Sequence, residues 1–207
     1  MSVSALESLE RLQVGNRRFI EGHQAHAEIT LRDQLEASNR AQQPFAIVIG
    51  CSDSRVPVEI VFDQGIGDLF VIRVAGNVVA PSQIDSVEFA VDQFGTQLVV
   101  VLGHSNCGAI RATLDELHRP DEKRSANLHS IVDRIRPAVE SLVGGELEDD
   151  REAMVRAGVR ANVSSSVEQL RHGSTLLENL IAAERLYVVG AEYSLNTGLV
   201  EFFEGIG

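Results

Sequence analysis

The sequence predicts an α/β fold with a central, mostly parallel sheet of about four strands, an antiparallel C-terminal edge strand and flanking helices. Three observations lead to this prediction. Four short apolar runs lie at 45–50, 70–74, 98–102 and 186–189. Segments with apolar residues at helical spacing separate these runs. Near the C-terminus, the turn-forming sequence Asn-Thr-Gly at 196–198 stands between two further strand-like runs.

The four apolar runs are rich in Val, Ile and Leu and do not alternate with polar residues. Unbroken runs of this kind indicate strands buried on both faces, which is typical of a parallel sheet covered by helices. The runs at 191–195 and 199–203 flank the Asn-Thr-Gly turn and predict a hairpin. This hairpin would add the antiparallel edge strand.

Residues 4–22 predict an amphipathic helix before the first strand. Its apolar face carries Leu6, Leu9, Leu12, Phe19 and Ile20. The helix has no preceding strand to cover, so it is a candidate arm onto a second subunit. Packing on its own domain is an equally good interpretation of the pattern.

The later helices have recognisable ends. Ser82 with an acidic residue three positions on predicts one helix start, and Gly95 predicts its end. A long helix carries valines at steps of four between 155 and 167, and Thr175 with Glu178 predicts another start. We interpret the chain as a single domain over 1–207, with an N-terminal helical arm at 1–42 and an α/β core at 43–207.

Composition narrows the class of partner. The 207 residues include 44% hydrophobic residues, and the net charge is −12. Nucleic acids and anionic membranes require a basic surface, so neither is expected as a partner. No apolar run approaches the ~20 residues of a membrane span, and the N-terminus lacks a signal-peptide pattern. We therefore expect a cytoplasmic protein, with packaging in a bacterial microcompartment as an open alternative.

The two cysteines of the chain each follow a strand-like run that ends in glycine. Cys51 is followed by Asp53, and His104 stands three residues before Cys107. Two thiolates, an imidazole and a carboxylate form a tetrahedral ligand set for zinc. A carboxylate that can leave the metal would provide the open position that catalysis needs. These four residues are therefore the candidate zinc ligands.

The two cysteine-bearing loops should meet in space. Ligands of open parallel sheets bind beyond the carboxyl ends of the strands, and neighbouring strands are only ~4.8 Å apart. Arg55 is placed to hold Asp53 by a bidentate bond and so to compete with the metal. Ser52, Ser54, Ser105 and Asn106 are expected to form turns and hydrogen bonds with the thiolates. Inert buried cysteines and a closed structural zinc site are the alternatives, and the matched loops and Arg55 disfavour both.

These residues resemble the β-class carbonic anhydrases. The family's two signatures are similar to residues 51–57 (Cys-Ser-Asp-Ser-Arg-Val-Pro) and 104–109 (His-Ser-Asn-Cys-Gly-Ala). Residues 70–77 and 190–202 also resemble family segments. The resemblance covers essentially the whole chain, and the first two motifs together are highly specific.

The resemblance implies reversible hydration of carbon dioxide to bicarbonate and a proton, with one Zn²⁺ per subunit. It implies that Cys51, His104 and Cys107 bind the zinc and that water or hydroxide takes the fourth position. In a closed state, some family members place on the metal the aspartate that matches Asp53. The Asp53–Arg55 pair is the implied catalytic dyad, which orients the zinc-bound hydroxide and gates the metal. A homodimer or a dimer of dimers is implied, with active sites near the subunit boundary.

The resemblance also implies a substrate pocket. Gln42 matches a glutamine that forms hydrogen bonds with substrate, and Phe70 matches an aromatic wall residue. Phe89 stands where many relatives carry Tyr. One subgroup has a second bicarbonate pocket, which Arg73 and Tyr193 could match in part, but this chain has no Trp to complete that pocket.

Two rival functions stay open from the sequence. The substrate could be carbon disulfide or carbonyl sulfide on the same scaffold. The protein could also be a non-catalytic zinc-binding scaffold module, although a closed structural site needs no Arg55. For the hydratase, two thiolates cancel the charge of zinc, so we expect activity to rise with pH above neutral.

Overall fold

A five-stranded sheet with the order β2-β1-β3-β4-β5 forms the centre of the molecule. The structure is a computed structural model that describes residues 3–26, 30–118 and 126–205, the side chains of 126–129 excepted. The parallel strands are β1 (Ala46–Cys51), β2 (Leu69–Val74), β3 (Leu98–His104) and β4 (Tyr187–Tyr193). The edge strand β5 (Val200–Glu204) runs antiparallel to β4. The predicted fold class is confirmed.

β1 and β3 are buried along their whole length, as their unbroken apolar sequence predicts. The C-terminal hairpin differs in detail from the prediction. The runs at 186–189 and 191–195 are a single strand, β4, whose pairing with β5 shifts between Gly190 and Ala191. A shift in pairing lets a strand bend and still continue. The sequence therefore predicted two separate segments where the structure has one continuous strand.

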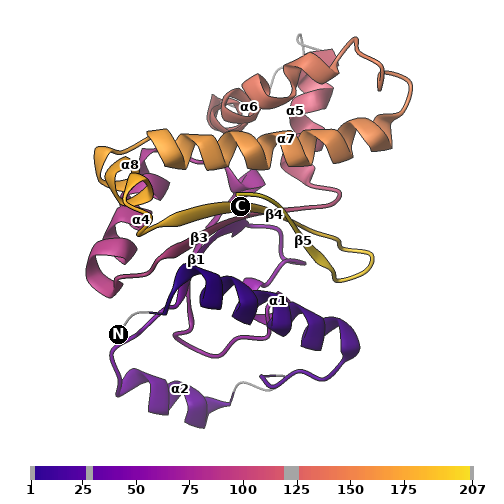
Figure 1. The fold of residues 1–207 in the computed structure, drawn as a ribbon. Coiled ribbons are helices and arrows are strands. Elements are labelled where there is room, and N and C mark those ends of the chain that lie inside the picture. Colours follow the sequence, from indigo (N-terminus) through magenta and orange to yellow (C-terminus); the bar gives the residue numbers. More distant parts are fainter. Residues whose placement is uncertain (1–2, 27–29, 119–125, 206–207) are drawn as a thin grey trace.

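Helices cover both faces of the sheet (Figure 1). The long helix α7 (Arg151–His172) lies over β3 and β4. Beyond it lie α5 (Gly108–His118) and α6 (Ala126–Val139). A Cβ on Gly103 of β3 would lie 2.6 Å from Cγ2 of Val163, so this glycine permits the close approach of α7.

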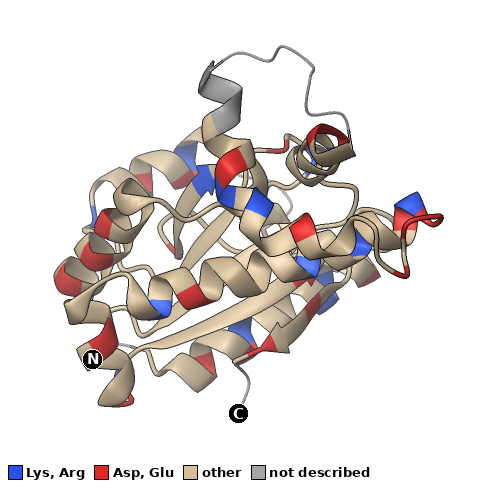
Figure 2. Cartoon of the chain, turned by 90° about the horizontal axis from the view of Figure 1, so that it is seen from above, with Lys and Arg blue, Asp and Glu red and all other residues tan. Residues whose placement is uncertain are grey.

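The remaining elements are shorter or lie at the ends of the sheet. Their bounds are α1 (Ala5–Glu21), α2 (Leu31–Ser38), α3 (Val58–Val61), η1 (Ala75–Asn77), α4 (Pro81–Phe94), η2 (Glu140–Leu142) and α8 (Thr175–Ala182). None of the helices in the described ranges is both long and apolar enough to cross a bilayer. In the view of Figure 2, Lys and Arg are interspersed with Asp and Glu along the helices.

The first helix packs on its own chain. In α1, Leu9 and Leu12 join the hydrophobic core that lies on the face of the sheet opposite α7. Ser8 Oγ donates to the carbonyl of Phe45 at 2.9 Å, and Asn16 Nδ2 donates to the carbonyl of Gly198 at 2.8 Å. These buried contacts show that α1 packs on its own chain. In contrast, no residue of α2 is buried.

Two predicted helix starts differ from the observed ones, by two positions for α4 and by one for α8. α4 begins at Pro81, and Ser82 lies inside the helix, because proline suits the first helical position and no side-chain cap is used. α8 is capped by Ser174 rather than Thr175, and the Ser174 hydroxyl accepts the amides of Leu176 and Leu177. In both cases the residue just before the predicted start decides the geometry.

Candidate active site

Cys51 and His104 are the last residues of adjacent parallel strands. β1 and β3 pair with Gly50 level with Leu102, so the ends of the two strands lie side by side. Asn106 then takes a left-handed conformation with φ 57°, which turns the chain back before Cys107 and the start of α5. The ligand atoms of Cys51, His104 and Cys107 all lie within 4.8 Å of one another. The predicted convergence of these three residues is therefore present in the fold.

The environment of this cluster suits a metal ion. All three side chains are buried. His104 Nδ1 lies 2.9 Å from the carbonyl oxygen of Ser105, which fixes the ring and its tautomer. His104 Nε2 is buried and has no hydrogen-bond partner within the described structure. A buried nitrogen without a partner is costly, and a metal ion would satisfy it.

The two thiols influence each other's ionisation. The pKa of Cys51 is lowered to about 4, chiefly by its hydrogen bond with the Cys107 thiol and further by His104, although burial acts in the opposite direction. The same contact and burial raise the pKa of Cys107 well above its usual range. The pair thus loses its first proton readily and keeps the second. A divalent cation can replace that second proton between the sulfurs.

Asp53 and Arg55 form the predicted pair. Arg55 Nε and Nη2 donate to the two carboxylate oxygens of Asp53 at 2.9 and 2.7 Å, and the Arg55 amide adds a third bond at 3.0 Å. The side-chain bonds from Arg55 are the largest cause that holds the pKa of Asp53 well below its usual range. Asp53 is therefore a carboxylate, locked by a fork-shaped bidentate contact.

The carboxylate nevertheless faces the cysteine–histidine cluster. Asp53 Oδ2 lies 3.8 Å from His104 Nε2, the nitrogen that lacks a partner. One oxygen atom therefore borders both the guanidinium of Arg55 and the space between the candidate ligands. A small rotation of this side chain would exchange one neighbour for the other, which is the competition that the sequence suggests.

Three hydrogen bonds of the site were not predicted from the sequence. The amide of Gly76 in η1 donates to Cys51 Sγ at 3.3 Å. Arg73 at the end of β2 donates through Nη2 to the carbonyl of Asp53 at 2.7 Å and through Nε to that of Cys51 at 3.2 Å. The Gly76 donor is a backbone amide, which carries no side-chain signal, and the sequence suggested Arg73 only for a second bicarbonate pocket. Only the resemblance of residues 70–77 to a family segment could have pointed to these contacts.

The expected hydrogen bonds from Ser105 and Asn106 to the thiolates are replaced by other contacts. Ser105 Oγ accepts the amide of Leu195 at 2.9 Å, and Asn106 Oδ1 accepts Arg111 Nη2 at 2.8 Å. The backbone amides of Ala109 and Ile110 at the start of α5 donate hydrogen bonds to Cys107 instead. The polar residues of this loop therefore fix the loop itself.

The candidate substrate residues do not surround Cys51 of their own chain. Phe70 is level with Ile47 in the sheet, four positions before Cys51 and therefore roughly 13 Å away along the strand. Phe89 on α4 packs against Phe70, with ring centroids 6.3 Å apart, and is 53% exposed. Gln42 is exposed in the segment before β1. All three thus lie toward the amino ends of β1 and β2.

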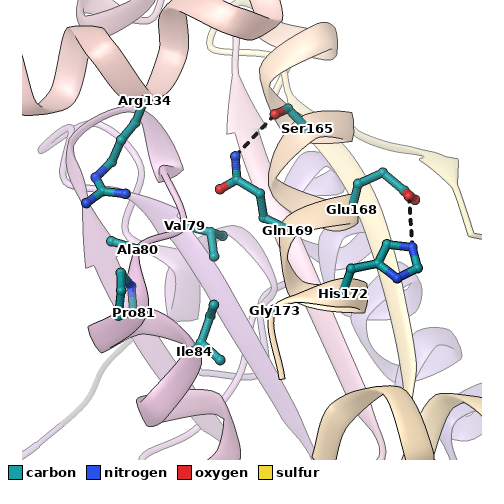
Figure 3. Close-up of a pocket in the computed structure, with 10 residues that line it drawn as sticks. All are labelled: Val79, Ala80, Pro81, Ile84, Arg134, Ser165, Glu168, Gln169, His172 and Gly173. Carbon is teal, nitrogen blue, oxygen red and sulfur yellow. Dashed lines mark hydrogen bonds and ion pairs between the residues drawn. The ribbon is translucent and has the colours of Figure 1, made fainter. Parts of the chain in front are cut away.

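A separate pocket of about 530 Å³ opens between the start of α4 and the C-terminal half of α7 (Figure 3). Val79, Pro81 and Ile84 contribute apolar lining. Its histidine, His172, is engaged by Glu168 at 3.5 Å. Neither cysteine nor His104 lines this pocket, so it is separate from the candidate metal site.

Comparisons with known proteins agree with the site. A family model described as "Carbonic anhydrase" matches residues 46–200. A carbonic anhydrase of Mycolicibacterium smegmatis is 38% identical over 196 residues, which cover 95% of this chain and 92% of that protein. Carbonic anhydrase 2 of Mycobacterium tuberculosis is 35% identical over 95% of this chain and 91% of its own length.

Solved structures give the same answer. The β-carbonic anhydrase CafA of Aspergillus fumigatus superposes with a TM-score of 0.72 at 27% identity, covering 85% of this chain and 83% of its own. The β-carbonic anhydrase CcaA has a TM-score of 0.72 at 25% identity, covering 96% and 92%. With both cysteine motifs, the sheet order and these similarities in agreement, the chain belongs to the β-class carbonic anhydrase family, whose members are lyases.

Proposed function

We propose that this protein catalyses the reversible hydration of carbon dioxide to bicarbonate and a proton, with one Zn²⁺ held by Cys51, His104 and Cys107. The observation that carries the proposal is the buried Nε2 of His104. This nitrogen has no hydrogen-bond partner among the described residues and lies 3.8 Å from a carboxylate that Arg55 holds, and its ring belongs to a cluster whose ligand atoms lie within 4.8 Å of one another. Two thiols and an imidazole are a ligand set that zinc prefers over harder cations.

Zinc at this position, when bound, would act as a Lewis acid that makes hydroxide available from water at modest pH. Asp53 Oδ2 is placed to accept a hydrogen bond from a water or hydroxide next to His104 Nε2. Such a bond fixes the direction of the attacking lone pair toward the substrate carbon. Arg55 holds the Asp53 carboxylate in this role and keeps it from replacing the water.

We further propose that two copies of the chain share each substrate pocket. Gln42, Phe70 and Phe89 lie toward the opposite end of the strands from Cys51, so one chain alone does not enclose a substrate at its own site. A homodimer in which these residues face the partner's cysteines would complete the pocket. The exposed ring of Phe89 is consistent with a surface that a second copy covers. A dimer of dimers is compatible with the same arrangement.

The test is a stopped-flow assay of CO₂ hydration together with metal analysis of the purified protein. We expect one zinc per subunit, hydration that is abolished by a chelator and restored by Zn²⁺, and activity that rises between pH 7 and 9. A profile already flat from pH 6 would contradict the two-thiolate ligand set. Parallel assays with carbonyl sulfide and carbon disulfide as substrates test the alternative that the protein is a hydrolase. Stoichiometric zinc without turnover of any of these substrates would indicate a scaffold module.

A further inference from the structure

The short helical loop η1 (Ala75–Asn77) lies beside Cys51 and has an unusual backbone conformation. Gly76 and Asn77 are both left-handed, with φ of 66° and 44°. A residue other than glycine seldom adopts this region, and such backbones persist only where the surroundings hold them. The conformation directs the Gly76 amide at Cys51 Sγ, 3.3 Å away. Whatever holds the loop therefore determines whether this donor reaches the sulfur.

Two side chains of α7 hold the loop from behind. Asn162 Nδ2 donates to the carbonyl of Gly76 at 2.8 Å, and Ser166 Oγ donates to the carbonyl of Asn77 at 3.1 Å. The two residues are four positions apart and so lie one turn apart on the same face of the helix. Both are almost completely buried. Two successive carbonyls of the loop are thus bound by a single helix.

The opposite side of the loop is also confined. A Cβ on Gly76 would lie 2.9 Å from Cβ of Ala109 and 2.9 Å from Cδ1 of Ile135, so α5 and α6 press on the loop closely. The side-chain amide of Asn77 does not stabilise the loop through its nitrogen, because Nδ2 is buried and has no hydrogen-bond partner within the described residues. The polar bonds that fix the carbonyls of the loop come from α7.

We propose that Asn162 and Ser166 are positioning residues of the metal centre, which fix the η1 loop so that the Gly76 amide binds the sulfur of Cys51. This inference rests on the proposed function, since it assigns these residues to the proposed zinc site. An amide donor stabilises negative charge on a thiolate and orients its lone pairs. Glycine has the greatest backbone freedom of any residue, so without anchors the amide would turn away from the sulfur.

The chain offers matched controls for both residues. Asn16 is also a buried asparagine on a helix, and its Nδ2 donates to the carbonyls of Val61 and Gly198. Ser8 is also a buried helical serine, and its Oγ donates to the carbonyl of Phe45. Asn162→Ala is compared with Asn16→Ala, and Ser166→Ala with Ser8→Ala. Each pair removes the same chemical group, but only one member of each pair acts on the loop beside Cys51.

The measurements are Co²⁺ affinity of the metal-free protein by competition with a chelator, the thiolate-to-cobalt charge-transfer band and the thermal midpoint. We expect Asn162→Ala to weaken Co²⁺ binding about tenfold and Ser166→Ala several-fold, as is usual for groups behind a metal ligand. The band should move to longer wavelength in both, because a thiolate that loses a hydrogen bond gives up an electron more easily. Asn16→Ala and Ser8→Ala should lower the thermal midpoint but leave affinity and band unchanged.

The inference is overturned if all four variants bind Co²⁺ as the unmodified protein does, or if their affinities fall in proportion to their thermal midpoints. Should Asn162→Ala fail to fold, the smaller change Ser166→Ala decides the matter alone. An unmodified protein that shows no thiolate-to-cobalt band would overturn the metal centre of the proposed function and this inference together. A normal band in that protein with unaltered variants would overturn the inference only. None of these results depends on turnover of carbon dioxide.

Discussion

The position of the Asp53 carboxylate is set by Arg55. Three hydrogen bonds from Arg55 hold it, while Oδ2 remains 3.8 Å from His104 Nε2. Because the arginine is 57% exposed and the carboxylate only 17%, the pair can open toward solvent without disturbing the core. In the proposed mechanism, Arg55 would determine whether Asp53 assists a zinc-bound water or replaces it.

Substitution of either member of this pair should separate activity from metal binding. We expect Asp53→Ala to keep its zinc and to lose at least about 10²-fold in kcat for CO₂ hydration, the typical loss for a positioned proton-accepting group. Arg55→Ala should also lose activity, because the freed carboxylate can reach the metal. Zinc content and stopped-flow kinetics check both variants. Full activity in Arg55→Ala would contradict the role of the pair.

At the scale of the element, α1 is joined to the core rather than extended from it. Leu12 is fully buried, whereas Leu6 on the same helix is 75% exposed. The apolar face predicted from the sequence therefore includes residues with very different surroundings. Only the inner part of this face contributes to the stability of the single chain.

The two leucines of α1 give a direct comparison. Leu12→Ala should lower the free energy of unfolding by about 2–5 kcal/mol, since it leaves a cavity in the core. Leu6→Ala should change it by no more than about 0.5 kcal/mol. Urea unfolding at fixed protein concentration measures both. Equal and large losses would mean that the outer part of the helix is buried in an assembly.

A second feature at this scale is the set of contacts by which Asp63 fixes the segment that follows α1. The buried carboxylate of Asp63 accepts the amides of Ala25 and His26 at 2.9 and 2.8 Å and pairs with Arg18. Burial acts to raise the pKa of Asp63, but the Ala25 amide, Arg18 and the His26 amide outweigh it and lower the pKa below its usual range. The ionised carboxylate therefore fixes the chain where it leaves the helix.

This anchor should make stability dependent on pH. A carboxyl group whose pKa is lower in the folded than in the unfolded state stabilises the protein above about pH 4, and the contribution is lost as pH falls further. Asp63→Asn should therefore cost about 2 kcal/mol at pH 7. The difference from the unmodified protein should shrink as the pH approaches 3. Urea unfolding at several pH values tests this, with the exposed Asp133→Asn as a control that should show little change.

At the scale of the whole molecule, the sheet separates two groups of candidate functional residues. Cys51 and His104 lie at the carboxyl ends of β1 and β3, whereas Phe70 lies near the start of β2. Rigid strands cannot bring these groups together within one chain. In a symmetric dimer, each chain can offer the first group to one site and the second group to the other.

Subunit mixing tests this arrangement. Asp53→Ala and Gln42→Ala should each be poorly active alone. Mixed dimers would carry one intact site, because each chain supplies the part that the other lacks. Random mixing should restore about a quarter of the unmodified activity for an isologous dimer. Activity that remains at the sum of the two single variants would show that each site is built from one chain.

Much of the fold and of the candidate site could be predicted from the sequence alone. The strands could be predicted because their apolar runs are continuous, and the Asp53–Arg55 pair because its members are adjacent in the chain. The observed N-caps, Ala80 and Ser174, lie before the predicted ones, Ser82 and Thr175, because capping depends on backbone geometry that a polar side chain alone does not specify. The packing of α1 could not be decided, because an apolar stripe does not specify which surface it covers.

The sequence by itself determined the identity of the candidate ligands, the fold class and the family, since these depend on residue types and on patterns along the chain. Only the tertiary structure decided how the ligands are surrounded. It showed that His104 Nε2 has no hydrogen-bond partner in the described part of the chain, that the Gly76 amide donates to Cys51 and that Asn162 and Ser166 bind the carbonyls of the η1 loop. These hydrogen bonds join residues up to 89 positions apart, and each involves a backbone atom that is chemically the same in every residue, so no pattern of side chains records them.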